Sequence, residues 1–326
     1  MSSDEEMIWT EKYRPKKLDD LVGNDAVVLR LKQFARQKNM PHCLFIGPAG
    51  VGKTTAAICL SRDILGEHFR EGYLELNASS DNRIDVVRTQ IKDYARTTTF
   101  SGIPFKILVL DEADNMTPEA QQALRRTMEI YSNVCRFILI ANYSNRIIEP
   151  IQSRCAVFRF TRLSKNDVVE RLRYIAEQEG LKYDREGLEA IYDEHQGDLR
   201  MCINTLQSLA VLNKKVDKQN VLEVLGSVYL ADISQIIDLS LEGKFNDARR
   251  KLQDVLYLKA IPPEDVVRQI YREIVKSGLP DKVKVEVLGY LGEVEFRLVQ
   301  GSDGEVQLDA LLALSLIHIS EPTRPY

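Results

Sequence analysis

The stretch Gly47-Pro48-Ala49-Gly50-Val51-Gly52-Lys53-Thr54 matches G-x-x-x-x-G-K-[ST], the pattern of a phosphate-binding loop. Its glycines would let backbone N–H groups close around phosphate oxygens without a clash at Cβ. Lys53 would bring a point charge to the β- and γ-phosphates, and Thr54 would offer a hydroxyl to Mg²⁺. The loop should open a helix whose positive dipole end faces the anion, so Thr55 joins the predicted nucleotide-binding residues.

The residues around this loop follow the order that a phosphate-binding loop requires. An apolar run at 43–46 is typical of a buried strand, and residues 55–60 can form a helix. The alternative, a glycine-rich turn that only joins two elements, is less favoured. The alternation continues to about residue 160, which predicts an α/β P-loop NTPase domain with a parallel sheet and helices on both faces. The predicted strands are 43–46, 73–76, 106–110, 136–141 and 156–160.

From about Leu163 the strand-like runs end and helical patterns follow. Ser164, Asp184 and Asp198 can each cap the start of a helix, which predicts a compact helical unit. A second all-helical region follows Tyr229. One of its faces is predicted from apolar residues at helical spacing: Val283, Val287, Leu291, Val294 and Leu298.

The bulk composition is typical of a soluble globular protein, and 326 residues allow about two domains with their own cores. The net charge of −4 argues against a generally basic nucleic-acid coat, although a local basic strip stays possible. Five scattered cysteines without a C-x-x-C pair argue against zinc binding and a disulfide framework. The acidic N-terminus is no signal peptide, and no apolar run approaches the ~20 residues that span a bilayer. We therefore expect no membrane partner.

A second motif, residues 107–114, ends an apolar run in carboxylates. The carboxyl edge of a parallel sheet is where open α/β folds bind ligands. Asp111 is placed to hold Mg²⁺, and Glu112 can polarise an attacking water. Acidic turn residues after a strand are common by themselves, but about sixty residues after a phosphate loop they indicate nucleotide hydrolysis.

Three further residues could complete a hydrolysis site. Asn142 follows the 136–141 strand and could hold the lytic water or the γ-phosphate, or be a simple turn residue. Arg154 could act as an arginine finger that neutralises transition-state charge, or form a surface ion pair. Arg200, near the start of a helix in the small helical unit, could reach back to the γ-phosphate.

Five motifs are considered together: Glu11-Lys12-Tyr13-Arg14-Pro15, the phosphate loop, Leu76-Asn77-Ala78-Ser79, Asp111-Glu112-Ala113-Asp114 and Ser153-Arg154-Cys155. They resemble the small subunits of replication factor C, the AAA+ sliding-clamp loader, over residues 7 to about 313. The phrase at residues 145–155, Asn-Arg-Ile-Ile-Glu-Pro-Ile-Gln-Ser-Arg-Cys, resembles archaeal members most.

This resemblance implies ATP and Mg²⁺ as cofactors, and an AAA+ nucleotide-binding domain at residues 1–162. A helical lid would follow at 163–228, and a helical collar that assembles five subunits into a ring would follow at 229–314. The implied partners are a PCNA-type sliding clamp, primer–template DNA, the replication factor C large subunit and further small subunits. The location would be cytoplasmic and nucleoid-associated in an archaeon, or nuclear in a eukaryote.

The resemblance also assigns roles to single residues. The arginine matching Arg154 acts in trans on ATP held by a neighbouring subunit, and the one matching Arg200 acts in cis. Asn77 matches a residue that links DNA occupancy to the water-activating glutamate. The adenine would be flanked by Tyr13, Arg14, Val22 and Gly23.

DNA contact is expected along residues 79–92. Arg88 and Lys92 share a helical face and Arg83 lies at its start, so the three could follow a phosphate backbone. A solvated face that mixes Asp and Arg explains the composition equally well. Residues 78–82, Ala-Ser-Ser-Asp-Asn, depart from the family's usual Ala-Ser-Asp-Glu-Arg-Gly, which blurs where this helix starts. Residues 128–132 resemble the clamp-contacting surface, with a buried helix end as the alternative.

The last twelve residues, 315–326, do not continue the helical period of the collar. Their sequence resembles translated sequencing-adapter read-through. We therefore interpret this tail as non-native, with a C-terminal partner-binding tail as the alternative.

The leading hypothesis is an ATPase subunit that opens the clamp and loads it onto primer–template DNA during replication. One rival is an AAA+ DNA motor, a helicase or branch-migration ATPase. Only 212 residues follow Asp114, however, and they are helical after about residue 163, so a second α/β lobe does not fit. Residues 100–102 could mimic an aromatic pore loop but are more simply a turn. A second rival is a ring member that binds nucleotide without hydrolysing it, against which stand the intact Lys53, Thr54, Asp111, Glu112 and Arg154.

Overall fold

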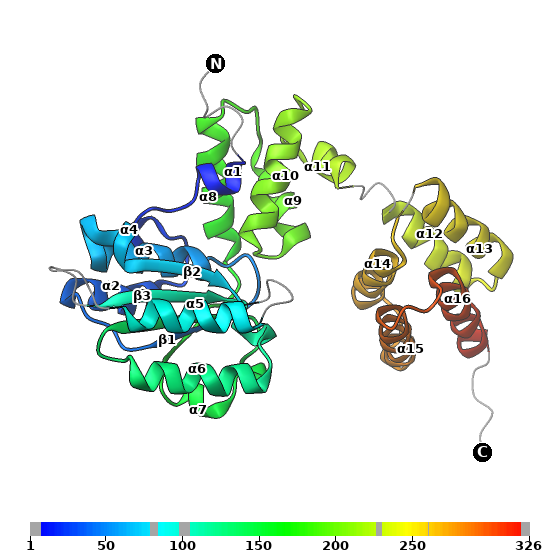
Figure 1. The fold of residues 1–326 in the computed structure, drawn as a ribbon. Helices are drawn as coiled ribbons and strands as arrows, with labels where there is room; N and C mark the ends of the chain where they lie inside the picture. The colour runs from blue at the N-terminus through cyan, green and yellow to red at the C-terminus, as the bar shows by residue number, and fades with distance from the viewer. Residues whose placement is uncertain (1–7, 79–83, 98–104, 226–229, 260, 321–326) are drawn as a thin grey trace. The chain divides into compact units, whose positions relative to one another are not determined.

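The computed structural model describes residues 8–78, 84–97, 105–225, 230–259 and 261–320 (Figure 1). The side chains of 84–88, 230–231 and 314–320 lie outside that description. The chain forms two compact units, Met1–Val221 and Leu222–Tyr326, and each is described by itself. None of the helices in the described part of the chain combines the length and the apolar character needed to cross a membrane.

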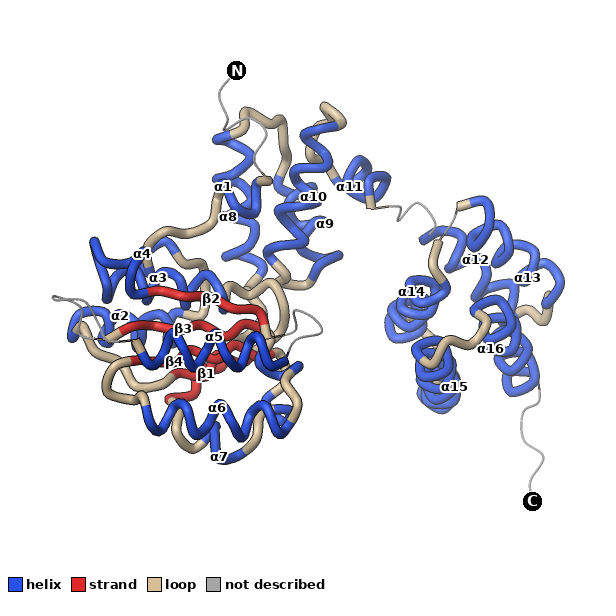
Figure 2. The backbone as a smooth tube through the Cα atoms, in the orientation of Figure 1, coloured by secondary structure: helices blue, strands red, loops and turns tan. Residues whose placement is uncertain are grey.

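The first unit contains a five-stranded parallel sheet in the order β2-β3-β4-β1-β5 (Figure 2). All five predicted strands are confirmed, each within one residue at either end. Parallel strands buried on both faces read as unbroken apolar runs, which is why they stand out in the sequence. The strands are β1 (Cys43–Ile46), β2 (Tyr73–Asn77), β3 (Lys106–Asp111), β4 (Cys135–Ala141) and β5 (Ala156–Arg159).

Each face of the sheet packs against its own set of helices, as predicted. Alternate strand residues point to opposite faces, so Phe45 and Val109 enter one core while Leu44 and Leu108 enter the other. The helices that contribute to the first core are α2 (Asp25–Gln37), α3 (Lys53–Leu65) and α4 (Phe69–Gly72). The helices that contribute to the second core are α5 (Ile84–Arg96), α6 (Pro118–Ile130) and α7 (Glu149–Gln152). Short 3₁₀ turns are Leu18–Asp20, Gly66–His68, Ala113–Asn115 and Ser144–Arg146.

The helical unit after the sheet begins where its capping residues predict. The side chains of Ser164, Asp184 and Asp198 each accept a hydrogen bond from the backbone N–H three residues later. Apart from an isolated bridge between Tyr183 and Val216, the described chain beyond β5 is helical or irregular. The helices are α8 (Lys165–Gln178), α9 (Arg185–His195), α10 (Leu199–Val211) and α11 (Lys218–Val224).

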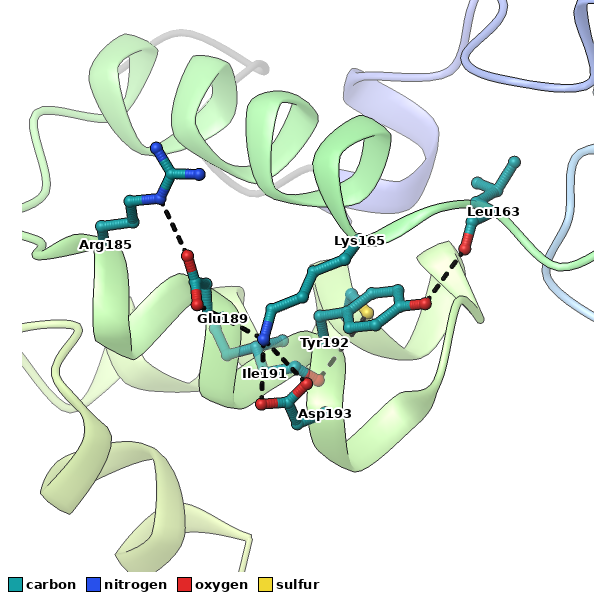
Figure 3. Close-up of polar contacts among 8 residues, drawn as sticks. Leu163, Lys165, Arg185, Glu189, Ile191, Tyr192 and Asp193 are labelled. Atoms are coloured by element: carbon teal, nitrogen blue, oxygen red, sulfur yellow. Dashed lines mark hydrogen bonds and ion pairs between the residues drawn. The ribbon is translucent and has the colours of Figure 1, made fainter.

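Polar contacts fix α8 against α9 (Figure 3). The ammonium of Lys165 lies 3.0 Å from the carboxylate of Asp193 and 3.3 Å from that of Glu189. The hydroxyl of Tyr192 donates to the carbonyl of Leu163 over 3.4 Å, at the junction between sheet and helices. The ion pairs are largely exposed and each contributes little to stability, so their main effect is orientation.

The described residues of the second unit form helices and the turns between them. The predicted apolar face is largely confirmed, since Val287, Leu291, Val294 and Leu298 of α15 (Asp281–Val299) are buried in the core of this unit. Its helices are α12 (Leu230–Leu241), α13 (Phe245–Gln253), a π-helical turn Asp254–Leu258, α14 (Pro263–Lys276), α15 (Asp281–Val299) and α16 (Gly304–Ser320).

The backbone of α16 extends to Ser320, into the segment that the sequence separates from the collar, and the interpretation of 315–326 as non-native stays a prediction. No glycine or proline follows Gly304 until Pro322, so nothing in the sequence breaks the helix earlier.

His42, in the loop before β1, predicts a pH dependence of stability. Its Nδ1 accepts a hydrogen bond from the N–H of Phe137 over 3.1 Å, which requires the neutral ring. Burial, and next the nearby Arg136, lower the pKa of His42 to about 4. The unfolded chain takes up the proton near pH 6.5, so it binds more protons than the folded chain between these values. The free energy of unfolding should therefore fall by about 1–3 kcal/mol as pH drops from 6.5 to 4.

Urea unfolding followed by the fluorescence of Trp9, the only tryptophan, measures this effect at pH 7 and pH 4.5. His42→Asn keeps a neutral acceptor and should show a smaller loss between the two pH values. An equal loss in both proteins would exclude His42 as the cause.

Candidate active site

The phosphate-binding loop follows β1 and is closely packed at two of its glycines. A Cβ on Gly47 would come within 2.3 Å of the carbonyl oxygen of Phe160. One on Gly50, whose φ is +71°, would come within 1.8 Å of the Asp198 carboxylate. The carbonyl of Gly50 also accepts from the N–H of Leu199 over 3.1 Å. Glycine is required at position 47 because the chain after β5 lies against the loop, and at position 50 because the α8–α10 helical unit contacts the loop directly.

Lys53 is buried at the start of α3 and makes three hydrogen bonds inside the protein. Its ammonium donates to the carbonyls of Gly47 over 2.6 Å and Pro48 over 2.7 Å. The third bond goes to Oδ1 of Asn142, over 2.9 Å. Asn142 follows β4, so the loop and the strand end are joined through this lysine.

The charged groups around Lys53 have opposite effects on its pKa. Burial lowers its pKa and so does the Arg200 guanidinium, whereas the carboxylates of Asp111 and Asp114 raise it. The predicted site residues Asp111, at the end of β3, and Arg200, on α10, therefore lie close enough to Lys53 to interact with it electrostatically.

Thr54 and Asp111 form the predicted metal-binding pair. The Thr54 hydroxyl donates to Oδ2 of Asp111 over 2.7 Å, and Oδ1 of Asp111 accepts from the N–H of Glu112 over 2.8 Å. A hydroxyl and a carboxylate are oxygen donors of the kind that Mg²⁺ takes together with phosphates and waters. The residues present therefore fit this ion.

Glu112 has a left-handed backbone with φ of +54°, which is uncommon for a residue other than glycine. Its carboxylate lines the pocket and accepts from the side-chain amide of Asn115 over 3.2 Å. The strained backbone turns the chain sharply after β3, so that Asp111 and Glu112 face the pocket from successive positions.

Asp114 has a structural role that its position in the motif alone did not reveal. It is buried, and its Oδ2 accepts from the backbone N–H groups of Asn142 and Tyr143 over 3.1 and 3.2 Å. This carboxylate fixes the end of β4 relative to the end of β3. Asn142 is thereby more than a turn residue, since both its backbone and its side chain are held in the site.

A cavity of about 200 Å³ brings most predicted site residues together. Its wall combines the N-terminal segment, the sheet edge and the α8–α10 helical unit. The predicted residues in the wall are Tyr13, Arg14, Val22, Ala49, Gly50, Val51, Gly52, Lys53, Thr54, Thr55, Asp111, Glu112, Asn142 and Arg200. Residues that the sequence did not single out as site residues are Thr10, Glu11, Pro15, Leu21, Leu163, Arg171, Leu199 and Ile203.

Three predicted nucleotide-binding residues lie beside the wall. Gly47 and Pro48 contribute the carbonyls that hold Lys53. Gly23 packs against Leu163 and Asp167, where a Cβ would come within 2.8 Å of the Leu163 side chain.

Arg154 lies outside the pocket of its own chain. Its guanidinium contacts the carboxylate of Glu129 at 2.6 Å and donates to the carbonyl of Pro150 over 2.8 Å. It lines a separate depression that also includes Arg136 and His42. Within one copy, the surface ion pair left open by the sequence is the arrangement that forms.

The predicted switch and DNA-binding residues are placed less completely. Asn77 ends β2 and stands opposite Asp111 in the strand register. Lys92 is exposed on α5. Arg88 belongs to the same helix, but its side chain lies outside the described atoms, and Arg83 and residues 100–102 lie outside the described residues.

Three family models match successive segments of the chain. ATPase family associated with various cellular activities (AAA) matches residues 43–163, a middle domain matches 164–223, and Replication factor C C-terminal domain matches 230–314. The replication factor C small subunit of Staphylothermus marinus is 53% identical over 310 residues, covering 94% of both chains. The chain belongs to the replication factor C small-subunit family. The Aeropyrum pernix member of this family is also 53% identical, over 96% of this chain and 97% of its own.

Solved structures extend the likeness of this replication factor C chain to more distant proteins. The Thermotoga maritima RuvB Holliday junction branch migration motor matches with a TM-score of 0.53 over 79% of this chain and 85% of its own. A single-residue variant of the same RuvB protein reaches 0.55 over 75% of this chain and 87% of its own. Sequence identity is 16% in both, so the match shows a shared fold and carries no function across.

Proposed function

We propose that this replication factor C small subunit is an ATPase of a sliding-clamp loader, which opens a PCNA-type clamp and loads it onto primer–template DNA during replication. The observation that carries the proposal is that one predicted catalytic residue, Arg154, lies outside the pocket that contains the others. Lys53, Thr54, Glu112 and Arg200 share one pocket, whereas Arg154 lies on another surface of the same chain. Such a site is completed by a neighbouring copy.

The residues of the pocket have separate roles in ATP hydrolysis. Lys53 and the loop amides bind the β- and γ-phosphates, and Thr54 and Asp111 hold Mg²⁺, which when bound neutralises charge on the phosphate oxygens. Glu112 polarises the attacking water, and Asn142 holds that water or the γ-phosphate. Arg200, from the lid, contacts the γ-phosphate of the ATP that is bound to the same chain. The position of the lid therefore depends on whether ATP or ADP is bound.

Arg154 acts on ATP held by the next subunit. An arginine finger stabilises the charge of the transition state only where subunits meet, so hydrolysis depends on assembly. The proposed assembly is a five-membered ring with the replication factor C large subunit and further small subunits. Residues 1–162, 163–228 and 229–314 act in it as AAA+ domain, lid and collar, with 315–326 as a non-native tail.

The outer surface of the AAA+ domain meets DNA and clamp. Lys92, with Arg88 and Arg83, follows the DNA backbone, and Asn77, opposite Asp111 in the strand register, links DNA occupancy to Glu112. Residues 128–132 contact the clamp; Met128 there is buried in the core, so the contact would be made by the exposed part of the segment, which includes Ile130 at 71% exposed. Because its relatives are archaeal, the protein acts in the cytoplasm with the nucleoid.

Steady-state ATP hydrolysis with and without primed DNA and clamp tests this function. Turnover of the assembled loader should rise severalfold when both are added, because DNA and clamp align Glu112 and Arg154. An unwinding assay on forked DNA is the counter-test. Strand separation by this subunit with its large-subunit partner would favour a DNA motor instead.

A further inference from the structure

The N-terminal segment joins the lid to the AAA+ domain across the mouth of the nucleotide pocket. Its helix α1 (Trp9–Lys12) lies against the lid, where the N–H of Trp9 donates to the side chain of Gln207 on α10 over 3.1 Å. The Trp9 side chain is buried, and its ring meets the ring of Tyr13 edge-on at 6.4 Å. The same Tyr13 ring meets Tyr174 of α8 edge-on at 6.4 Å.

Glu179, at the end of α8, accepts two hydrogen bonds from this segment with a single oxygen. The ammonium of Lys12 lies 2.7 Å from Oε1, and the hydroxyl of Tyr13 donates to the same atom. A carboxylate at a helix C-terminus faces the negative end of the helix dipole, and these two donors offset the resulting repulsion. Burial, and next the bond to Glu179, raise the pKa of Tyr13 well above its usual value.

Arg171, two turns earlier on α8, holds the backbone of the same residue. Its guanidinium donates to the carbonyl of Tyr13 over 2.6 Å and stacks over the Tyr174 ring at 5.3 Å. Burial lowers the pKa of Arg171, so this charge is partly removed from water. Both the backbone and the side chain of Tyr13 are therefore fixed by α8.

The other end of the segment belongs to the AAA+ core. The carbonyl of Pro15 accepts from the thiol of Cys59 over 3.3 Å. Leu18 is buried in the core of the sheet, and its N–H donates to Asp63 over 3.4 Å. This segment therefore connects the lid to the core in addition to residues 160–164 and to the contact of Leu199 with Gly50, and residues of all three connections line the nucleotide pocket.

The segment forms only one end of the pocket. Tyr13, Arg14 and Pro15 are in its wall, whereas the phosphate end is formed by Lys53 and Thr54. We propose that Glu179 and Arg171 are positioning residues which hold Tyr13 and Arg14 as a preformed wall for the nucleobase, so that lid closure and base recognition occur together. The inference rests on the proposed function in one respect, namely that the ligand is ATP.

The test compares a ligand that carries a nucleobase with a ligand that has only the phosphates. Isothermal titration calorimetry on the full chain measures the affinity for ATP and for inorganic tripolyphosphate. Glu179→Ala should weaken ATP binding about tenfold, because the wall must then be ordered on binding. It should change tripolyphosphate binding less than twofold. Arg171→Ala should have the same selective effect.

Two further variants control for folding and charge. Glu177→Ala removes a carboxylate of the same helix that bonds the Tyr183 hydroxyl at 2.8 Å, and it should leave both affinities unchanged. Glu179→Gln keeps an acceptor for Tyr13 without the charge and should lose less ATP affinity than Glu179→Ala. Acrylamide quenching of the Trp9 fluorescence should increase in Glu179→Ala, because α1 is released from the lid.

Equal losses of ATP and tripolyphosphate affinity would overturn the inference, since they would place Glu179 or Arg171 at the phosphates. Unchanged ATP affinity in both alanine variants would also overturn it and leave the proposed function intact. A wild-type protein that bound neither ligand would contradict the proposed function, and this inference with it.

Discussion

Replacing Lys53 by alanine is expected to abolish ATP turnover and to weaken ATP binding at least about tenfold. Lys53 is the buried cation of the phosphate-binding loop, and it holds the loop carbonyls of Gly47 and Pro48 to Asn142. Its loss removes both the charge and the connection between the loop and β4. Turnover and ATP affinity should therefore fall together, as measured by steady-state hydrolysis and calorimetry.

Lys32→Ala is a matched control, because Lys32 forms an ion pair with Asp19 at 2.5 Å on the surface of α2. It should keep full affinity and turnover. A Lys53→Ala protein that retained wild-type ATP affinity would show that the loop does not bind the phosphates.

Arg154→Ala is expected to separate binding from turnover. Arg154 lies outside the pocket of its own chain, so ATP affinity should stay within about twofold of wild type. Turnover stimulated by DNA and clamp should fall by about 10³-fold, which is the lower range for removal of an arginine finger. Arg173→Ala, which removes an exposed arginine of the lid paired with Glu170, should change neither quantity.

Mixing the two inactive variants tests whether Arg154 acts in trans. In rings assembled from a 1:1 mixture, some sites combine the intact loop of an Arg154→Ala copy with the intact arginine of a Lys53→Ala copy. Stimulated turnover should then recover in part. Full turnover in Arg154→Ala alone would defeat the finger assignment, and no recovery in the mixture would indicate action in cis.

The parts of the fold that the sequence predicted best are those set by local chemistry. Strands buried on both faces form unbroken apolar runs, so β1 and β3 could be located before the sheet was known. Ser164, Asp184 and Asp198 mark helix starts because a short polar side chain there satisfies a free backbone N–H. The phosphate loop and Asp111 follow from spacing around these elements.

The parts that could not be predicted depend on contacts between distant segments. Tyr13 and Glu179 are 166 residues apart, and no pattern in either neighbourhood indicates the other. Asp114 looks like any acidic turn residue until β4 is placed beside β3.

The internal hydrogen bonds of Lys53 have a consequence for the thermodynamics of nucleotide binding. Its ammonium donates to two carbonyls and an amide oxygen, so the protein itself satisfies all three donors of this buried cation. A phosphate that binds to the loop must compete with these oxygens for the same donors. The measured affinity therefore reports a difference between two sets of hydrogen bonds, and the subunit can release its nucleotide without leaving a buried charge unpaired.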